Sequence, residues 1–313
     1  MNDVIGQYLE HRPLLFSIAY RMTGSVSDAE DLVQDAYLRL DRRLRAGDEI
    51  ENTRAFLTTV TTRLAMDQMS SARARREAYV GAWLPEPLLV EQDPGPQERA
   101  ELADTLSFAF LVMLESLSPV ERAVFLLREV FEYDYAQVAE ITGKSEQNCR
   151  QILTRARRHI AASPRSSVSP ASPASSAEGE RVAREFIAAV QGGDVTGVLD
   201  LLAPDVVAIG DGGRRGIAAR VPLTGKEKVG SFLAANLRGG GRAARAEFAW
   251  VNGQPGGIGW DAHGRVLAVV ALEVTGGKIT AIRSVTNPDK LAHIGQTSDQ
   301  ALRRAARRAP GES

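Results

Sequence analysis

Residues 133–158, YDYAQVAEITGKSEQNCRQILTRARR, contain two helix-like segments separated by a glycine turn. In the first, Val138 and Ile141 are three residues apart, as on one face of a helix, and Thr142-Gly143-Lys144 supplies a C-terminal stop. The second begins at Ser145, a residue suited to cap a helix. Its apolar positions recur at three- and four-residue spacing: Cys149, Ile152, Leu153 and Ala156. The stretch therefore predicts a helix-turn-helix.

The other face of this last predicted helix is polar and basic. It carries Gln147, Asn148, Arg150, Gln151 and Arg155. Such side chains read base edges through paired hydrogen bonds or hold phosphates. An isolated charged face more often indicates only exposure to solvent. The combination with a short preceding helix and a glycine turn instead favours DNA binding. Upstream, Ser118–Glu121 (SPVE) has the form of a capping box with proline at the first helical position.

At this point the sequence resembles a known family. The segments LSPVER (117–122), YAQVAEI (135–141) and 145–158 are similar to the C-terminal DNA-binding domain of extracytoplasmic-function sigma factors. The resemblance implies that the helix after Ser145 binds the minus-35 promoter element. It also implies two partners, promoter DNA and core RNA polymerase, contacted at the clamp and flap of its large subunits.

Composition sets the frame for this hypothesis. The chain has 313 residues, a net charge of −1 and one cysteine, so we expect several domains and no disulfide framework. We read Cys149 as a core residue. The basic stretches 73–76 and 150–158 and the acidic stretch 28–35 are separated, so a neutral total does not exclude DNA. It does predict weak DNA binding by the free protein. With no long apolar run and no signal-like N-terminus, we expect a cytoplasmic protein without a membrane partner.

The first 80 residues are predicted to be helical. Ser27–Glu30 looks like a capping box that begins a helix. Residues 28–40, DAEDLVQDAYLRL, resemble the sigma segment that docks on the clamp helices of RNA polymerase. The resemblance assigns core-polymerase binding to the exposed side of this helix: Asp31, Gln34, Asp35 and Arg39.

A further helix, capped by Asn52 or Thr53, is predicted to follow. Its apolar stripe consists of Phe56, Leu57, Val60 and Leu64. In the family the matching stretch melts and captures the minus-10 element, which combines phosphate neutralisation with stacking or pockets for flipped bases. The resemblance assigns minus-10 binding to Arg63, Asp67, Arg73, Arg75 and Arg76. Arg63 stands where many relatives have Asn.

Residues 81–104 are predicted to be an extended, proline-rich linker. Its segment 83–88, WLPEPL, is more apolar than a spacer requires, which indicates a docking surface. WLPEPL resembles the linker signature of one sigma subfamily, which bears a C-terminal SnoaL-like extension of the NTF2-like fold.

The C-terminal sequence has the order expected for that extension. Helices are predicted at 180–190, 195–202 and 226–237, and strands at 206–209, 246–250, 257–261, 266–274 and 278–286. Helices first and an antiparallel sheet afterwards is an α+β order that resembles the NTF2-like cone. Asn287 and Pro288 predict the start of a terminal helix.

The motifs 211–214 (DGGR) and 287–291 (NPDKL) also resemble signatures of this subfamily, in which the extension regulates sigma activity. The resemblance therefore implies that no dedicated anti-sigma protein is required. We assign regulatory or interdomain roles to Trp83, Leu84, Pro85, Glu86, Pro87, Asp211, Gly212, Gly213, Asn287, Pro288 and Asp289.

The predicted fold is multidomain, with two all-α sigma domains, the second a helix-turn-helix, followed by an α+β NTF2-like or SnoaL-like cone domain. The expected divisions are 1–80 (sigma region 2), 81–104 (linker), 105–161 (sigma region 4), 162–177 (Ser/Pro/Ala linker), 178–297 (cone domain) and 298–313 (basic tail).

Two other function classes must be weighed. A one-component regulator with an effector-binding cone domain leaves 28–40 unexplained. A SnoaL-like isomerase or hydrolase needs a pocket, which Asp211, His263, Trp250 and Trp260 are candidates to line. However, His263 precedes a glycine between two strands, where a hairpin turn is the better interpretation. No metal-ligand spacing or phosphate-binding loop is present. We therefore expect no enzyme activity, cofactor or metal, and leave open whether the cone binds a small ligand.

Overall fold

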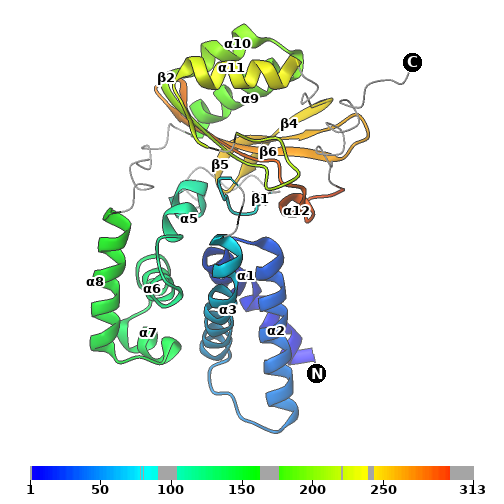
Figure 1. The fold of residues 1–313 in the computed structure, drawn as a ribbon. Helices are drawn as coiled ribbons and strands as arrows, with labels where there is room; N and C mark the ends of the chain where they lie inside the picture. Colours follow the sequence, from blue (N-terminus) through cyan, green and yellow to red (C-terminus); the bar gives the residue numbers. More distant parts are fainter. Residues whose placement is uncertain are drawn as a thin grey trace. The chain divides into compact units, whose positions relative to one another are not determined.

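The chain forms two compact units in the computed structural model (Figure 1). The structure describes residues 2–77, 79, 81–90, 104–162, 176–219, 221–238 and 243–296. The first unit comprises Met1–Glu77 and Leu111–Ser167, and the second comprises Ala78–Phe110 and Val168–Ser313. The segment that joins the two helical regions in sequence therefore belongs to the same unit as the C-terminal region.

All the regular secondary structure in the described residues of the first unit is helical. Its elements are α1 (Asn2–Thr23), α2 (Val26–Arg45), α3 (Thr53–Glu77), α6 (Pro119–Phe125), the π-helical turn η1 (Leu126–Val130), α7 (Tyr135–Thr142) and α8 (Glu146–Ala162). Helices α1, α2 and α3 pack on one another and bury Leu15, Ile18, Leu40 and Leu57 almost completely. Helix α5 (Phe108–Leu114) precedes α6 and spans the division between the units.

The predicted start of α2 was wrong. The helix begins at Val26, and its N-cap is Ser25, whose side chain accepts a hydrogen bond from the Asp28 amide at 3.0 Å. Gly24, with φ +68°, ends α1 directly before this cap. Because the left-handed glycine and the extended Ser25 make the turn between them, Ser27 falls inside the first turn of the helix.

The predicted helix-turn-helix is confirmed, including its caps. Ser118 and Glu121 form the capping box of α6. Gly143 closes α7 in the left-handed conformation, and the Ser145 hydroxyl accepts a hydrogen bond from the Asn148 amide at 3.2 Å. The shared core consists of Val124, Leu127, Val138, Ile141, Cys149, Ile152 and Leu153. Cys149 is buried, as predicted.

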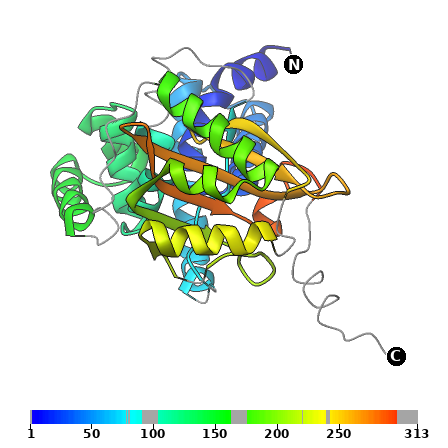
Figure 2. The ribbon, with the colours of Figure 1, turned by 90° about the horizontal axis from the view of Figure 1, so that it is seen from above.

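The second unit is an α+β structure, as predicted. Its helices are α9 (Ser176–Gly192), α10 (Val195–Leu201), α11 (Lys226–Arg238) and α12 (Pro288–Leu291). Its strands are β1 (Leu89–Val90), β2 (Leu202–Asp211), β3 (Leu223–Thr224), β4 (Arg245–Val251), β5 (Gln254–Trp260), β6 (Val266–Thr275) and β7 (Lys278–Val285). Helices α9, α10 and α11 cover one face of the sheet (Figures 1 and 2). Phe186 of α9 and Val229 of α11 pack there against Leu272 and Val274 of β6.

The sheet has the strand order β1-β4-β5-β6-β7-β2-β3. β2 pairs in parallel with β7, and the other neighbours are antiparallel. Since side chains alternate along a strand, Ala271 and Glu273 of β6 lie on the face opposite Leu272, and both are buried. The second face of the sheet is therefore also covered, and α12 lies on this side (Figure 1).

Strand β1 was not predicted. Residues 82–88 of the linker are extended without regular structure, as expected, but Leu89 and Val90 then pair with Val251 and Trp250 of β4. Two residues leave no periodic signal in the sequence, so this pairing is visible only in three dimensions. The linker adds a strand to the edge of the sheet.

Candidate functional sites

The structure brings the predicted minus-35 residues together on the solvent side of α8. Gln147, Arg150, Gln151 and Arg155 are exposed, and Asn148 is half-buried. The opposite side of α8 lies in the helix-turn-helix core. The geometry is therefore that of a helix fixed along one side and able to present polar side chains to a DNA groove along the other.

Sequence reasoning missed the role of Tyr135, which organises this surface. The Arg150 guanidinium lies over the Tyr135 ring, 4.6 Å from its centroid, and Arg128 lies 5.0 Å from it. Arg150 also donates to Glu146 at 2.9 Å. A ring face attracts a guanidinium and limits its rotamers. Tyr135 therefore holds Arg150 in one region of the surface.

Among the predicted minus-10 residues of α3, one is bonded to another helix, one is exposed, and the side chains of the other three are not described. Arg63 donates to the carbonyl oxygens of Glu140 and Ile141, each at 2.9 Å, at the C-terminal end of α7. A cation at this end satisfies helix carbonyls and interacts favourably with the helix dipole. Asp67 is exposed. The side chains of Arg73, Arg75 and Arg76 lie outside the described residues.

The predicted core-polymerase residues form one exposed surface on α2. Asp31, Gln34, Asp35 and Arg39 all face solvent, opposite the buried stripe of the helix. Sequence reasoning missed Leu38, which is 39% exposed and lies on this side of α2. Leu38 adds an apolar side chain to an otherwise polar and charged face.

The linker segment, defined here as Tyr79 and residues 81–90, packs on the sheet and on α12. Leu84, Pro85 and Pro87 are buried, and Trp83 and Glu86 are half-buried. Two hydrogen bonds join Leu88 and Asn252. The Leu88 amide donates to Asn252 Oδ1 at 2.9 Å, and the Asn252 amide donates to the Leu88 carbonyl oxygen at 2.8 Å. The predicted apolar motif 83–88 thus lies against the C-terminal region.

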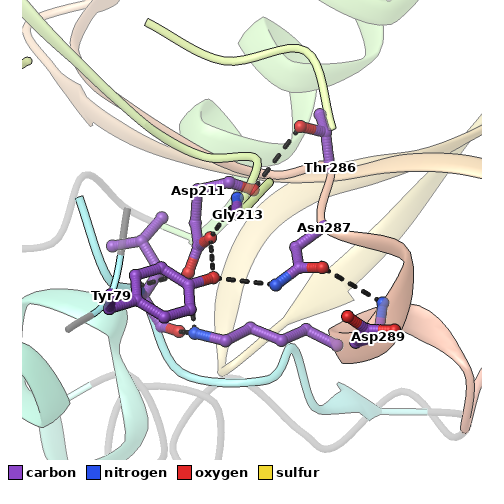
Figure 3. Close-up of polar contacts among 8 residues, drawn as sticks. Tyr79, Asp211, Gly213, Thr286, Asn287 and Asp289 are labelled. Carbon is purple, nitrogen blue, oxygen red and sulfur yellow. Dashed lines mark hydrogen bonds and ion pairs between the residues drawn. The ribbon is translucent and has the colours of Figure 1, made fainter. Parts of the chain in front are cut away.

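A buried carboxylate stands at the centre of these contacts (Figure 3). Asp211, at the end of β2, has no exposed surface. Its Oδ1 accepts from the Tyr79 hydroxyl at 2.5 Å and from the Gly213 amide at 3.2 Å. Its Oδ2 accepts from the Leu84 amide at 2.8 Å and from Lys290 Nζ at 2.7 Å. Asp211 therefore connects the linker segment, the glycine turn and α12.

The second C-terminal motif contacts the same centre. Asn287 caps α12 by accepting from the Asp289 amide at 3.1 Å, and its Nδ2 donates to the Tyr79 hydroxyl at 2.7 Å (Figure 3). Gly213 has φ +52°, and a Cβ there would lie 2.7 Å from Asn287 Nδ2. Glycine is therefore needed for both conformation and space. We call Tyr79, Leu84, Asp211, Asn287 and Lys290 the linker-docking site.

The remaining members of the two motifs surround this site. Gly212 and Pro288 are buried, while Asp289 is exposed and pairs with Arg215. Sequence reasoning did not single out Tyr79, and Lys290 appeared there only as a member of the NPDKL motif. Burial, followed by the nearby Asp211 charge, raises the pKa of Tyr79 well above its usual range. The Tyr79 hydroxyl therefore stays protonated and donates to Asp211.

The alternative catalytic set is not assembled. Asp211 is fully buried and bonded to the linker segment, whereas His263 is exposed in the turn between β5 and β6. Trp250 is buried, and Trp260 is half-buried beneath Arg245. Asp211, weighed as a candidate to line an open pocket, is instead covered by the linker segment. The prediction that His263 occupies a hairpin turn is confirmed.

Two further properties concern the described part of the chain alone. None of its helices combines the length and apolar character that crossing a bilayer demands. Among the same residues, no three or more His, Cys, Asp or Glu side chains are grouped so as to hold a metal ion.

Comparison with known proteins identifies the family to which the chain belongs. The family model of sigma-70 region 2 matches residues 7–75, and that of sigma-70 region 4 matches residues 107–160. The ECF RNA polymerase sigma factor SigJ of Mycobacterium tuberculosis (strain H37Rv) is 37% identical over 296 residues, covering 91% of this chain and 92% of SigJ. The chain belongs to the extracytoplasmic-function (ECF) sigma factors.

A second relative and a solved structure support the same family assignment. The probable ECF RNA polymerase sigma factor SigI of M. tuberculosis (strain CDC 1551) is 37% identical over 295 residues, covering 93% of this chain and 95% of SigI. The crystal structure of M. tuberculosis SigJ aligns with 33% identity and a TM-score of 0.67, over 92% of this chain and 98% of that one. ECF sigma factors bind RNA polymerase and promoter DNA, and they are not a class of enzymes. The family assignment favours this class over the one-component regulator.

The Tyr135 ring gives a first prediction. Tyr135→Ala should weaken minus-35-dependent promoter binding by the polymerase holoenzyme about two- to fivefold, because the cation–π contact that positions the exposed Arg150 is lost. Tyr135→Phe keeps the ring face and should bind like the wild type. The measurement is holoenzyme affinity for promoter fragments with intact or scrambled minus-35 elements. An equal loss on both fragments would show that Tyr135 does not act through base recognition.

The Tyr79 hydroxyl gives a second prediction. Tyr79→Phe should lower the unfolding free energy by about 1–3 kcal/mol, because a hydrogen bond to a buried carboxylate is lost. Because the pKa of Tyr79 is raised in the folded protein, the stabilisation by its hydroxyl is fully present below pH about 10, the ordinary tyrosine pKa. It decreases above that pH. Urea unfolding at pH 8, 10 and 11 should show the gap between wild type and variant narrowing. A gap that stays constant or widens with pH would contradict this.

Proposed function

We propose that the chain directs core RNA polymerase to promoters, with α8 binding the minus-35 element and α3 the minus-10 element. The observation that supports this most strongly is the alignment of about nine-tenths of the chain with SigJ. The exposed polar face of α8 gives the proposal its physical basis, since Arg150 and Gln147 have the donors that base edges require. The proposed function is the recruitment of core RNA polymerase to promoters, which takes place in the cytoplasm.

The partner surface for core polymerase is assigned to α2. Asp31 and Asp35 are four residues apart, and Leu38 follows one turn later, so the three lie along one side of the helix. Two carboxylates on one side of a helix suit a basic partner surface. We assign this surface to the polymerase clamp and the region-4 helices to the flap.

Arg63 is already engaged within the first unit. It uses two of its five N–H donors on the carbonyl oxygens of Glu140 and Ile141. Arg63 is itself exposed, so its contact with α7 is open to competition from water and phosphate. We therefore propose that Arg63 exchanges its contact with α7 for one with DNA when the minus-10 element is bound.

The sigma assignment predicts transcription that depends on this protein. Purified core polymerase with the full chain should give run-off transcripts from genomic promoter fragments that core polymerase alone does not give. Asp35→Lys should reduce core binding and transcript yield at least about tenfold, because it reverses a charge within the proposed contact surface. Glu49→Lys makes the same change on the loop after α2 and should have little effect.

Two results would count against this function. If neither transcription nor core binding occurs with the wild-type chain, the sigma assignment fails. If Glu49→Lys reduces core binding as strongly as Asp35→Lys, the assignment of the contact to α2 fails.

We further propose that the linker-docking site regulates sigma activity in place of a separate anti-sigma protein. The linker segment lies between the two DNA-binding regions in sequence, so its docking limits the arrangements that those regions can adopt. The support is the burial of Leu84, Pro85 and Pro87 against the second unit. A linker that served only as a spacer would have no need of a buried carboxylate to hold it.

Trp83→Ala tests the regulatory role. We expect faster proteolysis of the linker segment and a changed transcript yield, because the indole ring packs on Lys290. Trp260→Ala removes the same side chain from the second unit away from the linker segment, and serves as the matched control. Unchanged transcript yield and unchanged proteolysis in Trp83→Ala would exclude regulation through the linker segment.

A further inference from the structure

Lys290 is buried to an unusual degree for a lysine. Its residue exposure is 9%, although lysine is almost never buried unless it is paired. It lies on α12, which is fixed by the Asn287 cap and by Pro288 at the first helical position. The side chain extends from this helix to the linker segment, where its ammonium group ends.

The surroundings of the Lys290 ammonium complement a small cation. Nζ lies 2.7 Å from Asp211 Oδ2 and donates to the carbonyl oxygen of Leu84. The ring centroids of Trp83 and Tyr79 lie 4.3 and 4.9 Å from Nζ. Two oxygen acceptors and two aromatic faces are the groups that proteins use to bind ammonium ligands. Three of these four contacts come from the linker segment.

We propose that Tyr79, Trp83, Leu84 and Asp211 form a binding site for a primary ammonium ion, and that the Lys290 side chain is the resident ligand that holds the linker segment closed. The inference deepens the regulation proposed for the linker-docking site and rests on it for its effect on transcription. Lys290 lies in the NPDKL motif but was not among the residues assigned a site role from the sequence.

The charges explain why the ammonium is needed for closure. When the linker segment is docked, the Asp211 carboxylate has no exposed surface. Its other donors, Tyr79, Leu84 and Gly213, are neutral. A buried carboxylate without a cation is strongly unfavourable, and removing one partner of a buried pair costs more than the pair contributes. Without Lys290, the buried carboxylate must lose its charge or be hydrated, and we infer hydration, which requires the linker segment to leave.

The test uses hydrogen exchange of the full-length chain, read on peptides that cover 79–90. Lys290→Ala and Lys290→Met should each lower the protection of this segment by about a hundredfold, as expected for breaking a buried ion pair. Peptides of β6 should keep their protection, which shows that the sheet remains folded. Lys278→Met makes the same substitution at an exposed lysine of this unit and should leave 79–90 protected.

Chemical rescue separates a cation site from a packing defect. Lys290→Ala removes the atoms of an n-propylammonium ion, so tens of millimolar n-propylammonium chloride should restore the protection of 79–90. Sodium chloride at the same concentration should not restore it. Lys290→Met should not respond, because its side chain fills the space without supplying charge.

Several results would overturn the proposal. They are unchanged protection of 79–90 in Lys290→Met, rescue of both variants by n-propylammonium, or rescue of neither. If Lys290→Ala does not fold, Lys290→Met alone decides through the protection of 79–90. The assay contains no polymerase or DNA, so its outcome is independent of the transcription assay that tests the sigma function.

Discussion

The second unit depends on the satisfaction of one buried carboxylate. Asp211 has no exposed surface, and its donors come from the linker segment, the glycine turn and α12. Because each donor offsets part of the desolvation cost, the three segments stabilise one another's positions. The linker segment is thus part of the fold of the C-terminal region, although in sequence it connects two DNA-binding regions. This explains how a change in the C-terminal region can reach residues that precede it by more than a hundred positions.

In the first unit, two arginines join the two helical regions in different ways. Arg122 is almost fully buried and bonds both Met22 O and Glu115, each at 2.7 Å. Arg63 makes two backbone contacts to the end of α7 but is exposed. A buried, ion-paired arginine is costly to release, whereas an exposed one exchanges its partners readily. The first unit therefore combines a buried contact with an exposed one that is easier to exchange.

The sequence predicted what local rules control and missed what long-range contacts decide. The helix-turn-helix followed from apolar spacing, Gly143 and the Ser145 cap, all of which act within a few residues. The strands β4 to β7 followed from β-type runs between glycine turns. By contrast, the resemblance singled out DGG at 211–213 and NPDKL at 287–291 as motifs, but the burial of Asp211 by Tyr79 and Leu84 has no local signal. The burial of the Lys290 side chain has none for the same reason. The assignments of DNA and polymerase contacts remain predictions.

Strand β1 has a consequence for the solution behaviour of the protein. In the described sheet β1 flanks β4 and pairs there with Trp250 and Val251, so its departure would leave the outward backbone groups of these two residues without that partner. Uncovered strand edges pair with other chains. A linker segment that can leave its own sheet can also add to the sheet of a second molecule, as in domain swapping. The docked linker segment therefore covers one end of the β4 edge, and its opening would expose backbone groups through which two molecules can pair.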